Sequence, residues 1–174
     1  METAGINIRV LTPDDADALW DIRLEALESE PKAFSSSPKK HRRIKVEEFR
    51  ARLTADPANN FVIGVFADGK LCGMAGFVRE PAEKERHKGM VWGVYLNARV
   101  RGQGIGRAML KTLLERASKI QGLQQIVLKV AATQAAAIAT YRSLGFTTFG
   151  HEVHALCIDG RYIDEEYMVW NCKP

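Results

Sequence analysis

The chain of 174 residues is long enough for one domain with a substantial core, and its hydrophobic content of 46% is ordinary for a globular protein. Its formal charge of +4 is interspersed along the chain, and the absence of a basic stripe with interleaved aromatics argues against a nucleic-acid-binding module. No apolar run approaches the ~20 residues of a membrane helix, the start shows no export signal, and the cysteines lack metal-ligand or disulfide spacing. We therefore expect one cytoplasmic domain over residues 1–174, with no metal site and no membrane or nucleic-acid partner.

The first third of the chain predicts a strand followed by helices. Residues 6–11 read as a strand, and Thr12-Pro13-Asp14-Asp15 is typical of a helix start because it combines a capping side chain, an early proline and acids. This helix should run toward Glu28 and pack on a sheet through Leu19, Ile22, Arg23, Ala26 and Leu27. Residues 29–45 break into Ser, Pro and charge, and a short helix is expected over 47–53.

The rest of the chain alternates strands with two helices. The dipeptides Asp68-Gly69 and Asp159-Gly160 each indicate a tight hairpin turn. We expect an amphipathic helix that ends before Gly122 and a second helix, capped by Thr133, that stops at Gly145. The expected strands are residues 60–67, 70–79, 88–96, 125–131, 146–158 and 161–170, and the expected helices are residues 104–120 and 133–144.

A glycine-rich loop between the third of these strands and its helix is the most informative feature. Gly102, Gly104 and Gly106 allow the backbone to turn tightly and let an anion approach the amides. The helix that follows directs unpaired N–H groups and its positive dipole end at the same place. The spacing fits neither a P-loop, which needs Gly-Lys-Ser/Thr, nor a dinucleotide loop, because Arg107 stands where the third glycine belongs.

Two motifs in register resemble the GNAT superfamily of N-acetyltransferases. Arg101-Gly102-Gln103-Gly104-Ile105-Gly106 resembles its acetyl-CoA loop, and Gln134 to Phe146 resembles its second signature, N-x-x-A-x-x-x-Y-x-x-x-G-F. The resemblance implies an α/β (α+β) fold with a mixed, mostly antiparallel sheet, whose central strands splay apart and are flanked by helices. It also implies that acetyl-CoA, as cosubstrate, lies in that opening.

The resemblance assigns cofactor contacts to positions of this sequence. Val94 and Leu96 match the backbone positions that contact the pantetheine arm, and the Leu96 amide would face the thioester carbonyl, where it would stabilise developing negative charge. Gln134 stands where the family usually has Asn, so its side-chain amide is one methylene longer. The pyrophosphate would be held by the loop residues Arg101, Gly102, Gln103, Gly104, Ile105 and Gly106, together with the amide of Arg107.

Tyr141 is the candidate catalytic residue. Gln134, Ala137, Ile138 and Tyr141 recur at i, i+3, i+4 and i+7 and therefore share one helix face. A tyrosine hydroxyl with a pKa near 10 keeps its proton at neutral pH and can give it to the departing thiolate, whose acid has a pKa of about 8.5. The alternative is a tyrosine that anchors the helix on the core with its hydroxyl bonded to backbone.

The acceptor side is less well marked in the sequence. The segment from Arg23 to Ser35 and the tail from His154 to Glu165 resemble a subset of GNAT proteins, and family knowledge places the acceptor pocket beside them. Four of the candidates also have a plain structural reading: Glu25 as a solvated helix residue, Trp92 as a core aromatic, Glu152 as an exposed strand residue and His154 as a histidine with satisfied hydrogen bonds. The candidates are Glu25, Phe34, Trp92, Glu152 and His154.

Together, these features predict an acetyl-CoA-dependent N-acetyltransferase that transfers acetyl directly to the primary amine of a small molecule. An α-amino compound is favoured over a long polyamine because its amine loses a proton more easily. A protein N-acetyltransferase and a non-catalytic acyl-CoA-binding sensor remain alternatives. The sequence leaves open both a monomer and a homodimer.

Overall fold

The computed structural model describes residues 5–172 and contains a single mixed sheet of seven strands. The strand order is β1-β2-β3-β4-β5-β7-β6, and every neighbouring pair is antiparallel except β4 and β5, which are parallel. The mixed, mostly antiparallel sheet predicted from the sequence is therefore confirmed. The strands are β1 Ile6–Val10, β2 Asn60–Ala67, β3 Lys70–Arg79, β4 Lys88–Leu96, β5 Gln125–Ala131, β6 Thr147–Ile158 and β7 Arg161–Asn171.

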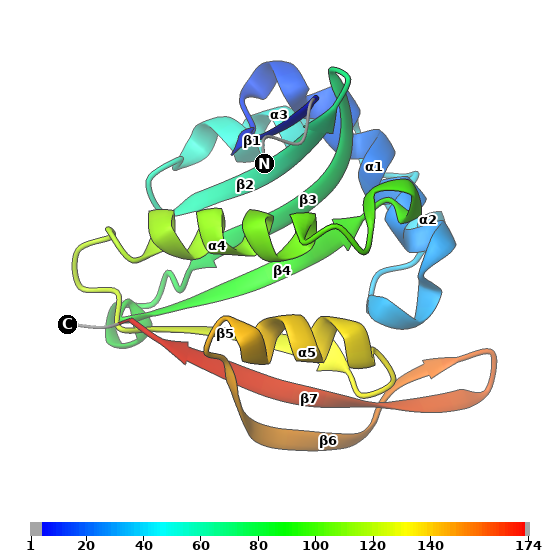
Figure 1. The fold of residues 1–174 in the computed structure, drawn as a ribbon, viewed down its shortest axis with the longest axis vertical. Coiled ribbons are helices and arrows are strands. Elements are labelled where there is room, and N and C mark those ends of the chain that lie inside the picture. Colours follow the sequence, from blue (N-terminus) through cyan, green and yellow to red (C-terminus); the bar gives the residue numbers. More distant parts are fainter. Residues whose placement is uncertain (1–4, 173–174) are drawn as a thin grey trace.

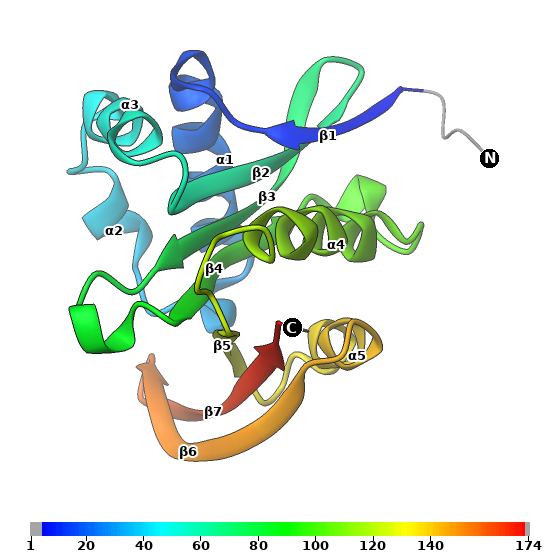
Figure 2. The same ribbon diagram turned by 90° about the vertical axis from the view of Figure 1, so that its left-hand side faces the viewer.

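Helices cover both faces of the sheet. Figure 2 shows α1 Ala16–Ser29, α2 Pro38–His41 and α3 Val46–Ala55 on one face, and α4 Ile105–Ala117 and α5 Ala135–Ser143 on the other. Short 3₁₀ turns lie at η1 Pro13–Asp15, η2 Pro31–Ala33, η3 Glu83–Glu85 and η4 Ala98–Val100. Within residues 5–172, none of the helices has both the length and the apolar character needed to cross a membrane.

The sheet divides the core into two buried clusters. Met109 and Leu113 of α4, both fully buried, pack with the central strands on one face. Leu19 of α1 and Phe49 of α3 belong to the cluster on the opposite face. Full burial of each such side chain stabilises the fold by about 1.5–3 kcal/mol, so the apolar stripes of the helices hold them rigidly against the sheet.

The two central strands separate along their length. β4 and β5 pair only at Lys88–Gln125, Gly89–Ile126 and Met90–Val127 in the described structure. Beyond Met90 the strands diverge, so that α4 accompanies β4 and α5 accompanies β5 (Figure 1). The splayed arrangement that the resemblance implies is thus present, and it opens the sheet between the two halves of the molecule.

A bulge bends β4 at the start of this opening. Trp92 faces Gly76 and Tyr95 faces Met74, so Gly93 and Val94 share one partner position on β3. Gly93 has a φ of +63°, in the left-handed region that favours glycine. An extra residue of this kind turns the strand and redirects its backbone groups, here at the edge of the opening.

Most expected boundaries are correct, and the differences lie at helix ends. The strands expected at residues 60–67, 70–79, 88–96 and 125–131 have the bounds predicted for them. The helix expected over 104–120 begins after Gly104 and ends at Ala117, because Lys119 and Ile120 donate to carbonyls only three residues back. The segment 29–45, expected to be irregular, contains η2 and α2.

The expected cap at Thr133 is wrong. The helix α5 starts at Ala135, and its N-cap is Gln134, whose φ of −88° and ψ of 61° are not helical. Gln134 is tied by its backbone, since its N–H donates to the carbonyl of Ala131 and its carbonyl accepts from Ile138. The side chain of Gln134 makes no capping bond, which leaves its amide free for other contacts.

Candidate active site

The glycine loop forms an open turn at the start of α4. Gly102 and Gly104 have φ values of +76° and +77°, and Gly104 is the N-cap residue of the helix. A Cβ added to either glycine would meet nothing within 4 Å, so it would project into open space. The first turn of a helix leaves its N–H groups unpaired. Unpaired amides of this kind can bind a phosphate group, and the sequence predicts that the pyrophosphate is held here.

The end of β4 presents backbone groups to the opening. Asn97 donates its N–H to the carbonyl of Cys72 on β3, and Leu96 lies opposite Gly73. Along an antiparallel pair of strands, the backbone N–H and C=O groups of successive residues point alternately toward and away from the partner strand. Because Asn97 bonds to β3, the amide and carbonyl of Leu96 point away from β3. The Leu96 carbonyl accepts a hydrogen bond of 2.7 Å from Arg101 Nε. The Leu96 amide points to the same side and is available to a ligand there.

A cavity of about 510 Å³ occupies the opening between β4 and β5. Residues 91–96 form one wall, residues 128–131 form the other, and the glycine loop, α4 and α5 close the same space. Segments that are far apart in the sequence therefore meet at one site. The predicted site residues that line it are Phe34, Trp92, Val94, Leu96, Arg101, Gly102, Gly104, Gly106, Arg107, Gln134 and Tyr141.

Five other candidates lie outside this lining. Gln103 and Ile105 belong to the loop itself, and Ile105 is buried as the first residue of α4. Glu25 lies on α1, and Glu152 and His154 lie on β6. Among residues 5–172, no group of three His, Cys, Asp or Glu side chains is close enough to hold a metal ion.

Tyr141 is a buried residue whose side chain lines the cavity. It is 5% exposed, and its ring packs edge-on against Phe146 with the ring centres 5.8 Å apart. Within residues 5–172 its hydroxyl has no hydrogen-bond partner, which differs from the anchoring role that would bond it to backbone. Burial raises the pKa of Tyr141 above its usual value, so the hydroxyl stays protonated and can donate.

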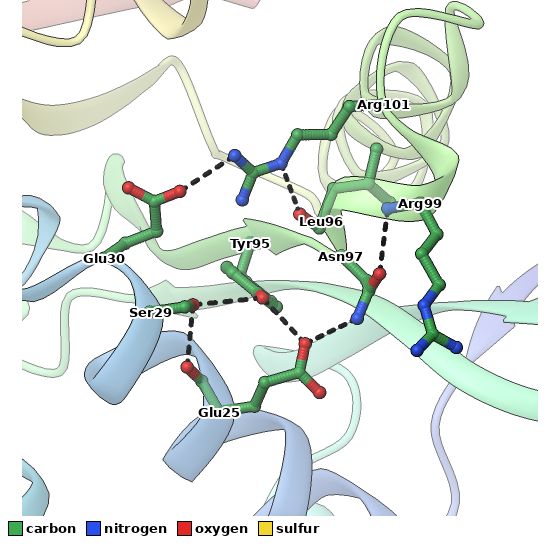
Figure 3. Close-up of polar contacts among 8 residues, drawn as sticks. All are labelled: Glu25, Ser29, Glu30, Tyr95, Leu96, Asn97, Arg99 and Arg101. Carbon is green, nitrogen blue, oxygen red and sulfur yellow. Dashed lines mark hydrogen bonds and ion pairs between the residues drawn. The ribbon is translucent and has the colours of Figure 1, made fainter.

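Glu25 belongs to a hydrogen-bonded network that joins α1 to the end of β4 (Figure 3). Its Oε1 accepts from Tyr95 at 2.8 Å and from Asn97 Nδ2 at 2.7 Å. Ser29 Oγ lies 3.1 Å from the Tyr95 hydroxyl and 2.8 Å from the Glu25 carbonyl. The carboxylate thus holds the strand end beside the helix, next to the cavity but not within it.

An ion pair connects the end of α1 with the glycine loop (Figure 3). Arg101 Nη1 lies 2.8 Å from Glu30 Oε1, while Arg101 Nε binds the Leu96 carbonyl. Glu30 and Arg101 both line the cavity. The Arg101 side chain therefore bridges three segments of the wall, a role that its place in the loop motif did not indicate.

The C-terminal candidates form a polar cluster on the β6–β7 hairpin. Glu152 accepts a hydrogen bond from the Tyr167 hydroxyl. His154 has a φ of +57°, donates its backbone N–H to Asp164 and stacks on Tyr162 with the ring centres 4.4 Å apart. Both side chains are exposed, and the structure brings neither of them into the lining of the cavity.

One charged residue beside the cavity, outside its lining, was given only a packing role in the sequence analysis. Arg23 lies on α1, and its guanidinium stands 4.6 Å from the centre of the Phe34 ring. The sequence did contain a signal for this residue. Arg23 lies on the helix face that carries the buried residues Leu19 and Ala26, and a charged residue is unusual on such an apolar face. Trp92 also lines this end of the cavity and packs across Gly76.

Comparison with known proteins decides the family. Residues 19–146 match the sequence profile of the Acetyltransferase (GNAT) family. The chain belongs to this family. The match includes the whole glycine loop and extends to the end of the second signature, so both GNAT motifs lie inside it.

Individual members of the GNAT family share from 23% to 36% of their residues with this chain in the three comparisons that follow. L-methionine sulfoximine/L-methionine sulfone acetyltransferase of Pseudomonas paraeruginosa is 36% identical over 81 residues, which cover 47% of this chain and 46% of that protein. The chain thus spans about half the length of this relative. Spermine/spermidine N(1)-acetyltransferase of Bacillus subtilis is 26% identical over 145 residues, 82% of this chain and 88% of the relative. The structure of yncA from Salmonella typhimurium with its cofactor acetyl-CoA superposes with a TM-score of 0.84 at 23% identity, covering 98% of this chain and 96% of that one.

Proposed function

We propose that this protein is an acetyl-CoA-dependent N-acetyltransferase that moves an acetyl group directly to the primary amine of a small molecule. The observation that carries this proposal is the cavity between β4 and β5, which the glycine loop and Tyr141 line together with Phe34 and Trp92. Cofactor and acceptor can therefore approach each other without a covalent enzyme intermediate.

Each part of the site has a role in this reaction. The amides of the glycine loop and the first turn of α4 hold the pyrophosphate, and Gln134 contacts the pantetheine arm. The Leu96 amide donates to the thioester carbonyl as negative charge develops on its oxygen. The Tyr141 hydroxyl donates to the sulfur as the thiolate leaves.

The lack of a free carboxylate base among the described lining residues of the cavity favours an α-amino acceptor. Among residues 5–172, Glu30 is the one carboxylate that lines the cavity, and it is paired with Arg101. A lysine-like amine with a pKa of about 10.4 needs roughly 4.6 kcal/mol to become neutral at pH 7, whereas an α-amino group near 7.8 needs about 1 kcal/mol. A site without a free base therefore suits the α-amine.

The relatives support small amines as acceptors in general. One is named for the amino-acid analogue L-methionine sulfoximine and another for the polyamines spermine and spermidine. A protein N-acetyltransferase is the rival within enzymes. A non-catalytic acyl-CoA sensor is the rival outside them, but binding alone needs no donor such as the Tyr141 hydroxyl, free of any partner in the described structure.

The test is release of free thiol from acetyl-CoA in the presence of amino acids, amino-acid amides, polyamines and peptides. We expect release with small α-amino compounds and weaker release with polyamines and protein lysines. Preferred acetylation of peptides would favour the protein acetyltransferase. Tight acetyl-CoA binding without thiol release from any member would favour the sensor.

A further inference from the structure

Arg23 is a half-buried cation that has no anionic partner within residues 5–172. Its Nη1 is the one fully buried side-chain nitrogen or oxygen in residues 5–172 that has no hydrogen-bond partner. Its Nε and Nη2 also make no hydrogen bond within these residues, and they retain some exposure. A buried guanidinium loses its hydration, and an ion pair normally compensates for this loss.

The acids that follow Arg23 in the chain, up to the end of α1, are already engaged. Glu25 accepts from Tyr95 and Asn97, Glu28 pairs with Arg42, and Glu30 pairs with Arg101. The Phe34 ring over the guanidinium offers a cation–π contact, which replaces only part of the lost hydration. The charge of Arg23 therefore remains uncompensated by the described residues.

The position of Arg23 points to the acceptor end of the cavity. A Cβ added to Gly93 would lie 3.6 Å from Arg23 Nη1, and Gly93 and Phe34 both line the cavity. The guanidinium thus stands directly behind the β4 bulge. The next residue, Val94, begins the stretch of backbone assigned to the pantetheine arm.

We propose that Arg23 receives the carboxylate of the acceptor, so that the substrate class is amino acids or close analogues that carry a free α-carboxylate. This inference rests on the proposed acetyltransferase function and narrows its substrate. A planar guanidinium binds carboxylates through paired, charge-assisted hydrogen bonds. An α-amino acid holds its amine two bonds from its carboxyl carbon, so a carboxylate on Arg23 places the amine beside the bulge.

The pairing also prepares the amine for reaction. A free carboxylate stabilises the neighbouring ammonium group and so keeps its pKa high. Binding that carboxylate to a guanidinium offsets this effect and adds a nearby positive charge, and both changes favour the neutral amine. Arg23 thus acts as a positioning and specificity residue in a site that holds no free carboxylate base among the lining residues described.

The experiment measures binding to the CoA-loaded enzyme by calorimetry. The probes are the L-amino acids and L-methionine sulfone, each paired with its own carboxamide, which keeps the amine and side chain but lacks the charge. We expect at least one acid to bind wild type more tightly than its amide, by about 10- to 100-fold, as charge-assisted hydrogen bonds contribute. Arg23→Gln should abolish this preference, and Arg23→Lys should keep part of it.

The matched control is Arg43→Gln, which removes the same charge from an exposed side chain with no partner in residues 5–172. This variant should retain the full preference. Circular dichroism and unchanged CoA affinity establish that the Arg23 variants are folded. The wild-type comparison of acids with amides needs no variant and is decisive if Arg23→Gln does not fold.

The inference is overturned if no acid is preferred over its amide by wild type, or if the preference survives in Arg23→Gln. Thiol release with amines but without any carboxylate preference would reject the inference and leave the acetyltransferase function intact. Carboxylate-dependent binding that Arg23→Gln abolishes, without thiol release from any probe, would support the subsite and reject the proposed function.

Discussion

Tyr141 lines the cavity from α5, and burial raises the pKa of its hydroxyl. A phenol that holds its proton this strongly stabilises a thiolate by donating a hydrogen bond as charge reaches the sulfur, and contributes little before that point. Tyr141→Phe should therefore lower kcat about 100-fold while the dissociation constant of acetyl-CoA changes less than threefold. Steady-state kinetics and calorimetry measure the two quantities.

A matched control for this variant is Tyr162→Phe, because Tyr162 is 62% exposed and lies outside the cavity lining. It removes the same hydroxyl and should leave kcat unchanged. Wild-type turnover in Tyr141→Phe would reassign Tyr141 to packing against Phe146.

Single residues also mark the limit of sequence reasoning. Glu25 was a candidate for the acceptor side, but its carboxylate accepts from Tyr95 and Asn97. These partners are 70 and 72 residues away in the chain. No local pattern around Glu25 contains information on such partners, because the approach of α1 to β4 depends on the whole sheet.

At the level of elements, the loop and the start of α4 should control cofactor affinity. Gly104 has a φ of +77°, and a side chain there would project into open space at the start of α4. Gly104→Val should weaken acetyl-CoA binding at least tenfold, or about 1.4 kcal/mol, because a branched side chain occupies the space that the pyrophosphate needs. Calorimetry with acetyl-CoA and CoA measures this effect.

Gly69→Val is the control for backbone strain. Gly69 also has a φ of +77° and open surroundings, but it lies in the β2–β3 turn far along the chain from the loop. Both variants strain a left-handed position, so both should lose stability. Only Gly104→Val should lose affinity, and equal affinities in the two folded variants would refute the loop assignment.

The start of α1 should contribute to stability in a pH-dependent manner. Arg9 donates two hydrogen bonds of 2.7 and 2.8 Å to the Asp15 carboxylate, and the Thr12 amide donates a third. Together these bonds lower the pKa of Asp15 to about 2. Because the folded pKa lies below the unfolded value of about 3.9, the stabilisation is present above pH 4 and is lost as the pH falls toward 2. Asp15→Asn should cost about 2 kcal/mol at pH 7 and little at pH 2.

Urea unfolding between pH 2 and pH 7 measures this difference. Asp14→Asn removes a neighbouring acid that is exposed and has no side-chain partner within residues 5–172, and its free energy of unfolding should follow wild type. A constant difference between wild type and Asp15→Asn across this pH range would contradict the assignment.

Elements were predicted best where the signal is local. The hairpin at Asp68-Gly69 fixed the bounds of β2 and β3, because a two-residue turn sets the register of its strands. The helix ends were less accurate. Thr133 has the side chain of a cap, yet the backbone of Gln134 follows from its bond to Ala131 on β5, which is a consequence of how α5 leaves the sheet.

At the scale of the whole molecule, the arrangement of carboxylates predicts how the rate depends on pH. The lining of the cavity contains only one carboxylate among residues 5–172, Glu30, and it is paired with Arg101. Without an enzymic base, kcat/KM should rise with pH and level off at the pKa of the acceptor's own amine, about 8 for an α-amino group in an amide. Two acceptors with different amine pKa values should give two different plateaus.

A pH profile with the same break for both acceptors would indicate an enzymic base instead. Variants Glu25→Gln and Glu152→Gln would then identify which carboxylate outside the lining is responsible. Loss of the shared break in one of them would assign the base, and its retention in both would indicate a water chain.

The sequence by itself determined the parts of this protein that depend on local pattern. Alternating and 3.6-residue periodicities specify strands and helices, and the glycine spacing from Gly102 to Gly106 with the second signature identified the GNAT family. Tertiary structure alone decided the rest. The Glu25 network and the uncompensated charge of Arg23 depend on residues far apart in the chain, whose distances follow from packing two helical layers on one sheet rather than from any local propensity.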